Sequence, residues 1–221
     1  MFGRTKAAAR HAPIASLLFS VPAVVIYLVP SLGDFLQLER ASVDAGEWWR
    51  LVTCHWTHWS LDHLLWDTLV FVILGVACER ASRARFVACV AGSALACSLG
   101  VWLFVPQVES YRGLSGVDSA LFAVLGLSLL REAVSERRAG SIAAAGSLLV
   151  AFVGKTVFEV VSGTTMFVDS SAGTVSVPLA HVIGAALGGY LATEHRFGRW
   201  PKDESDTAST SGPSKSCRRQ S

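Results

Sequence analysis

The sequence predicts an all-α membrane protein, a bundle of six transmembrane helices, and two observations carry that prediction. The 221 residues are 52% hydrophobic and only 16% charged, whereas soluble domains average about 25% charged residues. Three runs, 11–33, 86–108 and 170–193, contain no Asp, Glu, Lys or Arg, and each exceeds the ~20 apolar residues that cross a bilayer. This composition excludes a soluble enzyme, a nucleic-acid-binding protein and a disordered chain.

The predicted spans follow the apolar runs in order. They cover about 13–32, 61–78, 86–105, 114–130, 141–161 and 177–193. A basic head before an apolar run can also form a signal peptide. Only Ser31-Leu32-Gly33 places small residues two apart, however, so we expect the first span to be retained.

Three parts are expected along the chain. Residues 1–12 form a cytoplasmic basic head, and residues 13–196 form the six-span domain. Residues 197–221 form a disordered cytoplasmic tail, because their polar, low-complexity sequence cannot bury a core.

The placement of Lys and Arg predicts the orientation, because cytoplasmic loops carry the excess of basic residues. Of the 19 basic residues, 15 lie in the head, the second–third loop, the fourth–fifth loop and the tail. The alternate loops hold only Arg40, Arg50 and Arg112, and Lys155 lies within a span. Both termini are therefore expected in the cytoplasm, which agrees with an even number of spans.

Ionisable side chains inside spans are costly and usually mark function. In the predicted orientation, six such residues from four spans lie in the outer half of the membrane: His63, Asp67, Asp118, Lys155, Glu159 and His181. Their shared depth predicts a functional site. Lys155 and Glu159 are four residues apart on one helix, so we expect them to pair with each other.

A Gly113-Leu114-Ser115-Gly116 sequence stands where a loop becomes the fourth span. Glycines allow close backbone approach and unusual dihedral angles, and the first turn of a helix offers free N–H groups to an anion. These features suit a serine nucleophile with an oxyanion hole. Small residues also allow helices to pack closely in lipid, so the motif by itself leaves both interpretations open.

The sixth span carries His181 on the same helical face as Gly184 and Gly188. A matching stripe of small residues runs along the fourth span: Gly116, Ala120 and Ala123. Close contact between these faces would bring His181 to Ser115, as base activation of a hydroxyl requires. The alternative is that His181 only forms hydrogen bonds between helices.

Taken in order, these motifs resemble the rhomboid family of intramembrane serine proteases. The matching segments are the Trp49-Arg50 pair of the first outer loop, His58 and His63 of an H-x-x-x-x-H stretch, the acidic Glu79, the G-x-S-G of residues 113–116, and the A-H-x-x-G-x-x-x-G of residues 180–188. The compact six-span layout, the segment LERASVDAGEWWRLVT and the form Y-x-G-L-S-G-V are most similar to the rhombosortase branch.

The resemblance implies a multi-pass protease of the bacterial cytoplasmic (inner) membrane that cleaves single-span membrane proteins within the lipid bilayer. Its rhombosortase-like substrates would be exported proteins with C-terminal, glycine-containing anchors. Residues 13–196 would be the catalytic domain. No cofactor, metal or nucleic-acid partner is implied.

Residue roles follow from the same resemblance. Ser115 would attack the scissile carbonyl, and His181 would act as general base and then as acid, in a Ser-His dyad. His63 and the backbone N–H of Ser115 would stabilise the oxyanion, with Gly113 and Gly116 in support. The Trp49-Arg50 pair would hold the outer loop.

Asp67 departs from the family pattern, which usually has an asparagine that donates to the oxyanion. Either burial keeps the Asp67 carboxyl protonated, or Asp67 pairs with His63 four residues earlier and holds that ring cationic; we expect the pair. Asp118 lies three residues after Ser115 and could orient His181. It could instead bond the loop before Ser115, or water.

Two alternative functions compete with the protease. A membrane metallohydrolase could use the zinc-ligand types at His55, His58, His63 and Asp67, but His55 and His58 precede the span and an H-E-x-x-H signature is absent. A catalytically inactive rhomboid-like protein would bind membrane clients. Such relatives generally lack the serine or the histidine, and this sequence has both.

Overall fold

We describe the protein from a computed structural model, in which residues 12–164 and 177–194 are described. The predicted tail and nearly all of the predicted head lie outside these residues. Six longer helices dominate the described chain: α1 (Ile14–Tyr27), α5 (Leu61–Ala81), α6 (Arg83–Phe104), α7 (Ser115–Ser135), α8 (Ala139–Ser162) and α9 (Pro178–Thr193). The predicted all-α class is therefore confirmed.

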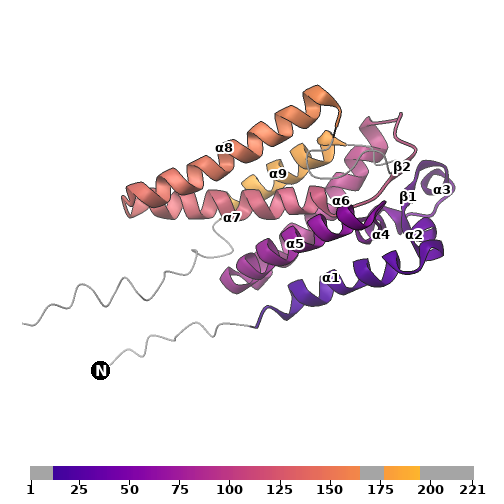
Figure 1. The fold of residues 1–221 in the computed structure, drawn as a ribbon, viewed down its shortest axis with the longest axis horizontal. Coiled ribbons are helices and arrows are strands. Elements are labelled where there is room, and N and C mark those ends of the chain that lie inside the picture. Colours follow the sequence, from indigo (N-terminus) through magenta and orange to yellow (C-terminus); the bar gives the residue numbers. More distant parts are fainter. Residues whose placement is uncertain (1–11, 165–176, 195–221) are drawn as a thin grey trace, which may run out of the picture.

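Short elements gather at one end of the bundle, to the right in Figure 1. They are α2 (Pro30–Leu36), β1 (Leu38–Glu39), α3 (Arg40–Asp44), α4 (Arg50–Thr53), the 3-10 helix η1 (Cys54–Trp56) and β2 (Ser110–Tyr111). The sequence predicted only a polar segment between the first two spans. The structure folds most of that segment into a compact loop region, residues 28–60.

Three of the described helices, α5, α6 and α8, are long and apolar enough to cross a membrane. The bent pair α1 and α2 would make a fourth if counted as one span. The 16-residue α9 is shorter, and α7 carries Asp118, Arg131 and Glu132. A helical membrane protein is therefore confirmed, and the count of six spans stays a prediction.

The predicted end of the first span is wrong. The sequence indicated a continuous span to about residue 32, but α1 ends at Tyr27 and the chain bends by 114° into α2. Pro30 causes the break, because a residue before proline is driven out of the helical region, and Val29 accordingly has φ −125° and ψ 86°. Proline then starts the next helix without losing a hydrogen bond.

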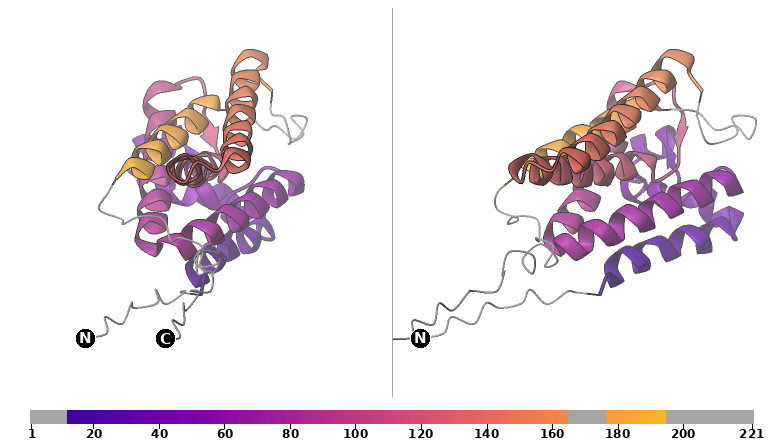
Figure 2. Two further views of the ribbon diagram at one scale, coloured as in Figure 1. Left: turned by 90° about the vertical axis from the view of Figure 1, so that its left-hand side faces the viewer. Right: turned by 60° about the vertical axis from the view of Figure 1, so that its left-hand side comes forward.

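Helix α7 lies in the middle of the bundle, in contact with α5, α6, α8 and α9, as the end-on view in Figure 2 shows. Its side chains Val117, Leu121 and Val124, and that of the preceding Leu114, are fully buried in the main hydrophobic core, with residues of α5 and α6. A helix surrounded in this way has little freedom to shift. It is therefore a rigid base for Ser115 at its first position.

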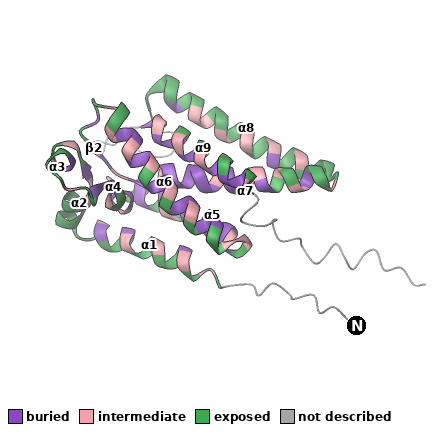
Figure 3. Ribbon diagram, turned by 180° about the vertical axis from the view of Figure 1, so that it is seen from behind, coloured by how far each residue is buried: buried purple, intermediate pink, exposed green. Residues whose placement is uncertain are grey.

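Helix α8 lies at the edge of the bundle, and its surface is mostly exposed (Figure 3). Large apolar side chains there face outward, including Val150 at 72% exposure and Val161 at 81%. Only Ala145 and Glu159 of α8 are buried. Such an apolar outer face suits contact with lipid, where no hydrophobic penalty opposes it.

The loop region of residues 28–60 is tied to the segment that precedes Ser115. Strands β1 and β2 pair antiparallel, with Leu38 opposite Tyr111. The Arg40 guanidinium donates to carbonyl oxygens at the end of α6, Trp102 at 2.6 Å and Val105 at 2.9 Å. Helix C-termini leave such carbonyls without partners, so Arg40 both caps α6 and fixes the loop.

Glu79 near the end of α5 caps a different helix. Its carboxylate accepts hydrogen bonds from the backbone N–H groups of Ala15 (3.1 Å) and Ser16 (2.8 Å), at the start of α1, and also from Arg83. These N–H groups have no partner within α1, and a negative charge there complements the helix dipole. Glu79 thereby fixes α1 to α5.

We expect Glu79→Ala to lower the free energy of unfolding by about 2–4 kcal/mol, because it leaves two backbone donors without their acceptor. The measurement is unfolding of the purified protein in detergent micelles. Arg83→Ala is the matched control and should cost at most about 1 kcal/mol, since the Arg83 side chain is 45% exposed. Equal losses in the two variants would contradict the capping role.

Candidate active site

The loop before Ser115 is held in a conformation that only glycine adopts easily. Gly113 has φ +117°, and a Cβ atom there would lie 2.7 Å from His63 Nε2 and 3.0 Å from Asp67 Oδ2. Its N–H donates to the Cys54 carbonyl at 3.2 Å. Glycine is therefore required at position 113 for two reasons, the unusual backbone conformation and the close approach of α5. Both were predicted for this motif from the sequence.

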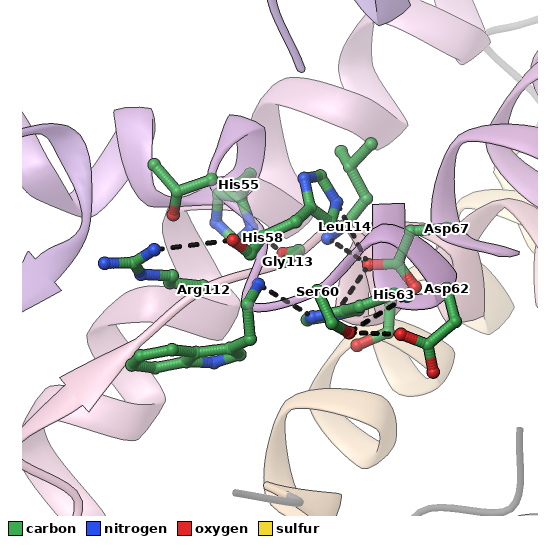
Figure 4. A network of polar contacts seen from close by, with 12 residues as sticks. His55, His58, Ser60, Asp62, His63, Asp67, Arg112, Gly113 and Leu114 are labelled. Atoms are coloured by element: carbon green, nitrogen blue, oxygen red, sulfur yellow. Dashed lines mark hydrogen bonds and ion pairs between the residues drawn. The ribbon is translucent and has the colours of Figure 1, made fainter. Parts of the chain in front are cut away.

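Asp67 is the centre of a polar network beside this loop (Figure 4). Its Oδ2 accepts from the backbone N–H of Leu114 at 2.8 Å, and lies 3.2 Å from His63 Nε2 and 3.5 Å from His58 Nε2. The predicted contact between Asp67 and His63 is confirmed. Asp67 acts here as an acceptor, which favours the ionised carboxylate of the two alternatives.

The orientation of the His63 ring follows from its two contacts. The Trp59 backbone N–H donates to His63 Nδ1 at 3.4 Å, which favours a lone pair on Nδ1 and the hydrogen on Nε2, and not the cationic ring expected from the sequence. Nε2–H then points at Asp67. The carboxylate thus holds His63 by its side chain and the serine loop by the Leu114 N–H.

His55 supports the same loop, a role that was not predicted from the sequence. Its Nδ1 lies 3.0 Å from the Gly113 carbonyl oxygen, and its Nε2 lies 2.8 Å from that of Ala94 in α6. Both ring nitrogens thus face backbone carbonyl oxygens, and the one that carries the hydrogen in the neutral ring donates to its carbonyl. This arrangement weighs against the metal-ligand role considered for His55. In the sequence, the only indication of this loop-supporting role was the i, i+3 spacing of His55 and His58 before the span.

Burial favours the neutral form of the two loop histidines. Burial lowers the pKa of His55 and of His58 below the usual 6.5, and this outweighs the opposing effects of the carbonyl contacts of His55 and of nearby Asp67. Because the pKa is lower in the folded state, the unfolded chain binds protons below pH 6.5 that the folded chain does not. Stability is therefore fully present above that pH and falls as the pH decreases through it.

We expect the thermal unfolding midpoint in detergent to be lower at pH 5.5 than at pH 7.5. Each histidine contributes at most about 1.4 kcal/mol per pH unit below 6.5. His55→Gln should be less stable at pH 7.5, yet lose less on acidification than the parent protein does. A parent midpoint that does not change between the two pH values would contradict the neutral, buried state.

Helices α7 and α9 are in backbone contact along the stripes of small residues. A Cβ atom at Gly184 would collide with the Gly116 carbonyl oxygen and lie 3.3 Å from the Ala120 nitrogen; one at Gly188 would collide with the Ala120 carbonyl oxygen. The close helix contact predicted from the sequence is confirmed. His181 lies one turn before Gly184, so it is held at the level of the serine loop.

The His181 ring contacts the Glu159 carboxylate, a contact that was not predicted from the sequence. Nδ1 lies 3.0 Å from Oε2 of Glu159 on α8. Glu159 also accepts from Lys155 Nζ, with both oxygens at 2.8 Å, so the predicted Lys155–Glu159 pair is confirmed. In the sequence, the only indication that Glu159 contacts His181 was that Lys155, Glu159 and His181 were predicted at one depth.

Two contacts considered for the site are not formed among the described residues. Ser115 Oγ makes no hydrogen bond to His181; such contacts are often long in free enzymes and tighten when substrate binds. Asp118 is buried, but it forms no ion pair with His181, and its Oδ1 has no hydrogen-bond partner in this part of the chain. The contact considered for Asp118 is made by Glu159 instead.

Trp49 and Arg50 lie at the start of α4, in the loop region of residues 28–60. The buried Arg50 guanidinium donates to the Asp34 and Gln37 carbonyl oxygens at 3.0 and 2.9 Å, and to Glu47 at 2.6 Å. Trp49 is half-exposed and packs on Phe35 at 6.1 Å between ring centroids. Neither contacts Ser115 or His181, which agrees with the loop-holding role expected of them.

Fold and site together define a helical membrane protein with a candidate serine–histidine site between two closely packed helices. The chain belongs to the rhomboid family, because the family model described as Rhomboid domain matches residues 45–195. That match covers the chain from α4 to α9, including every predicted site residue. The rhombosortase branch stays a prediction.

Three curated relatives support the family. The chain is 33% identical over 109 residues to the rhomboid-type protein YdcA of Bacillus subtilis (strain 168), covering 49% of this chain and 53% of YdcA. It is 32% identical over 109 residues to Rhomboid protease GluP of the same organism, covering 20% of GluP. RHOMBOID-like protein 5 of Arabidopsis thaliana is 28% identical over 107 residues, and 32% of it is covered. The chain thus matches about half or less of the length of each.

Proposed function

We propose that the protein is an intramembrane serine protease in which Ser115 is the nucleophile and His181 the general base. The observation that carries the proposal is the backbone contact of Gly116 with Gly184, since it holds the start of α7 and the first turn of α9 together. His181 would take the Ser115 proton as Oγ bonds the scissile carbonyl carbon. It would then return that proton to the leaving amine.

The oxyanion that forms would be stabilised at the helix start of α7. The backbone N–H of Ser115 is one donor, because the first N–H groups of a helix have no partner within it. His63 is the second, with its Nε2–H turning from Asp67 to the oxyanion when the substrate binds. Gly113 and Gly116 support both donors by allowing the loop and the helices to pack closely. A single donor of this kind contributes about 2.7–4 kcal/mol to transition-state stabilisation.

We further propose six spans with both termini in the cytoplasm. The helices α1, α5, α6, α7, α8 and α9 run alternately in opposite directions (Figures 1 and 2), which supports an even count. With the basic loops inside, the starts of α5, α7 and α9 face outward. The catalytic domain would then span residues 13–196 in the bacterial inner membrane, flanked by the head and the tail.

The proposed substrates are single-span membrane proteins, and in particular exported proteins that end in a glycine-containing anchor. The similarity of residues 38–53 and 111–117 to the rhombosortase branch supports this narrower class. The second candidate function is a rhomboid-like protein that binds membrane clients without cleaving them. The absent hydrogen bond between Ser115 and His181 in the described chain favours it.

Cleavage of a candidate single-span substrate by the parent protein, Ser115→Ala and His181→Ala distinguishes the two functions. We expect cleavage only by the parent protein. A fluorophosphonate probe should also label the parent protein and not Ser115→Ala. Equal processing and equal labelling in all three proteins would refute the protease and leave the client-binding function.

A further inference from the structure

We propose that Glu159 is a positioning residue for His181, so that the site operates as a Ser115–His181–Glu159 triad and not as a dyad. This inference rests on the proposed protease function. It concerns a residue on α8, a helix that supplies neither the nucleophile nor the base. Its basis is a carboxylate that faces the base from the side opposite to its reactive nitrogen.

The geometry is that of a base and its orienting carboxylate. Glu159 Oε2 lies 3.0 Å from His181 Nδ1, a hydrogen-bonding distance, but the two groups are not aligned as a hydrogen bond in this structure. A hydrogen on Nδ1 leaves the lone pair on Nε2, which is the nitrogen that must accept the Ser115 proton. A small rotation of the ring that aligns Nδ1–H with Oε2 would therefore select the tautomer that the proposed reaction needs.

The position of Glu159 is unusual for its helix. Most of α8 is exposed and apolar, whereas Glu159 is only 2% exposed and turned toward α9. A buried carboxylate is costly unless it is paired. Lys155 provides that pairing through both carboxylate oxygens, so the charge can be kept beside His181.

The carboxylate would also act during the reaction itself. As Ser115 Oγ bonds the carbonyl carbon, its proton moves to His181 Nε2 and the ring becomes a cation. Glu159 stabilises that cation through Nδ1–H, without taking the proton. When the C–N bond breaks, the proton leaves Nε2 for the amine and the ring is neutral again.

Other charged groups near this pair are accounted for. On α8 the neighbouring charge is Lys155, which holds Glu159. On α7 it is Asp118, which forms no ion pair with His181 among the described residues. On α5 Asp67 is engaged by His63, His58 and the Leu114 N–H. Among these carboxylates, Glu159 is therefore the one that contacts His181 in the described part of the chain.

The test is the kinetics of Glu159→Gln on a cleaved membrane substrate. We expect kcat to fall about 10- to 1000-fold with KM changed less than about threefold, since general-base catalysis contributes about 10²–10⁴-fold. The acid limb of the rate–pH profile should move to lower pH, because the His181 cation has lost its partner. Glu159→Asp should recover part of the rate.

A double variant separates positioning from folding, because Glu159→Gln alone leaves Lys155 as an unpaired cation in the membrane. Lys155→Met with Glu159→Gln removes that charge and should restore the unfolding midpoint, while the rate stays low. Parent-like rate and pH profile in the double variant would overturn the proposal, and so would a parent-like Glu159→Gln.

A final measurement does not depend on hydrolysis. The 15N spectrum of His181 in detergent should show the hydrogen on Nδ1 in the parent protein, and a mixture of tautomers in the double variant. If Ser115→Ala is inactive and the two spectra agree, the protease stands and the positioning role fails. If the parent protein is as inactive as Ser115→Ala, the proposed function itself fails.

Discussion

Gly184→Ala is expected to separate α7 from α9 and to remove both stability and activity. The new methyl group would collide with the Gly116 carbonyl oxygen and lie 3.0 Å from the Gly116 carbonyl carbon. These are backbone atoms of a buried helix, so neither can rotate away. Overpacking of this kind costs about 3 kcal/mol. The site would also suffer, because a displacement of about 1 Å costs about 10²-fold in rate.

Gly189→Ala is the matched control on the same helix. Its added methyl group would meet the Leu127 side chain at 3.5 Å, an ordinary contact with a flexible group. We expect it to change the unfolding midpoint and the labelling of Ser115 by a serine-reactive probe very little. Parent-like labelling and stability in Gly184→Ala would show that the Gly116–Gly184 contact does not hold the site.

The second large effect is expected at His63 and Asp67, where two variants should behave differently. His63→Ala removes the proposed oxyanion donor and should lose about 10²–10³-fold in kcat. Asp67→Asn keeps an oxygen that can accept from the Leu114 N–H, so it should stay within about tenfold of the parent rate. The measurement is kcat on one membrane substrate, with expression and unfolding compared in parallel.

Asp67→Leu is the informative third variant. It is close in size but leaves the Leu114 N–H and the two histidine rings without an acceptor, so the serine loop should lose its position and the protein its activity. If Asp67→Asn were as inactive as Ser115→Ala, the carboxylate would act in the reaction and not only as a support for the loop.

Much of the site could be predicted from the sequence because it depends on local spacing. The i, i+4 relation of His63 to Asp67, and of Lys155 to Glu159, follows from the geometry of one helix. The small faces of 116–123 and 184–188 could likewise be read from one-dimensional spacing. Their mutual contact needed only that the two helices be neighbours.

Other features depend on relations between distant segments. Glu79 caps α1 from 64 residues away, and His55 holds Gly113 from 58 residues away. No periodicity records such distances. The break at Pro30 carried a local signal, the proline itself, but the apolar run around it had the stronger influence on the predicted span.

The sequence by itself determined the membrane environment and most of the long helices, and it predicted one depth for the candidate site residues, because the scarcity of charge and its few exceptions are properties of single segments. Only the tertiary structure decided which carboxylate serves which histidine. Asp67, Asp118 and Glu159 all lie at fitting depth, but contact with a ring depends on how each helix is rotated about its axis. Packing against its neighbours sets that rotation, and it turns Glu159 to His181 and Asp67 to the serine loop.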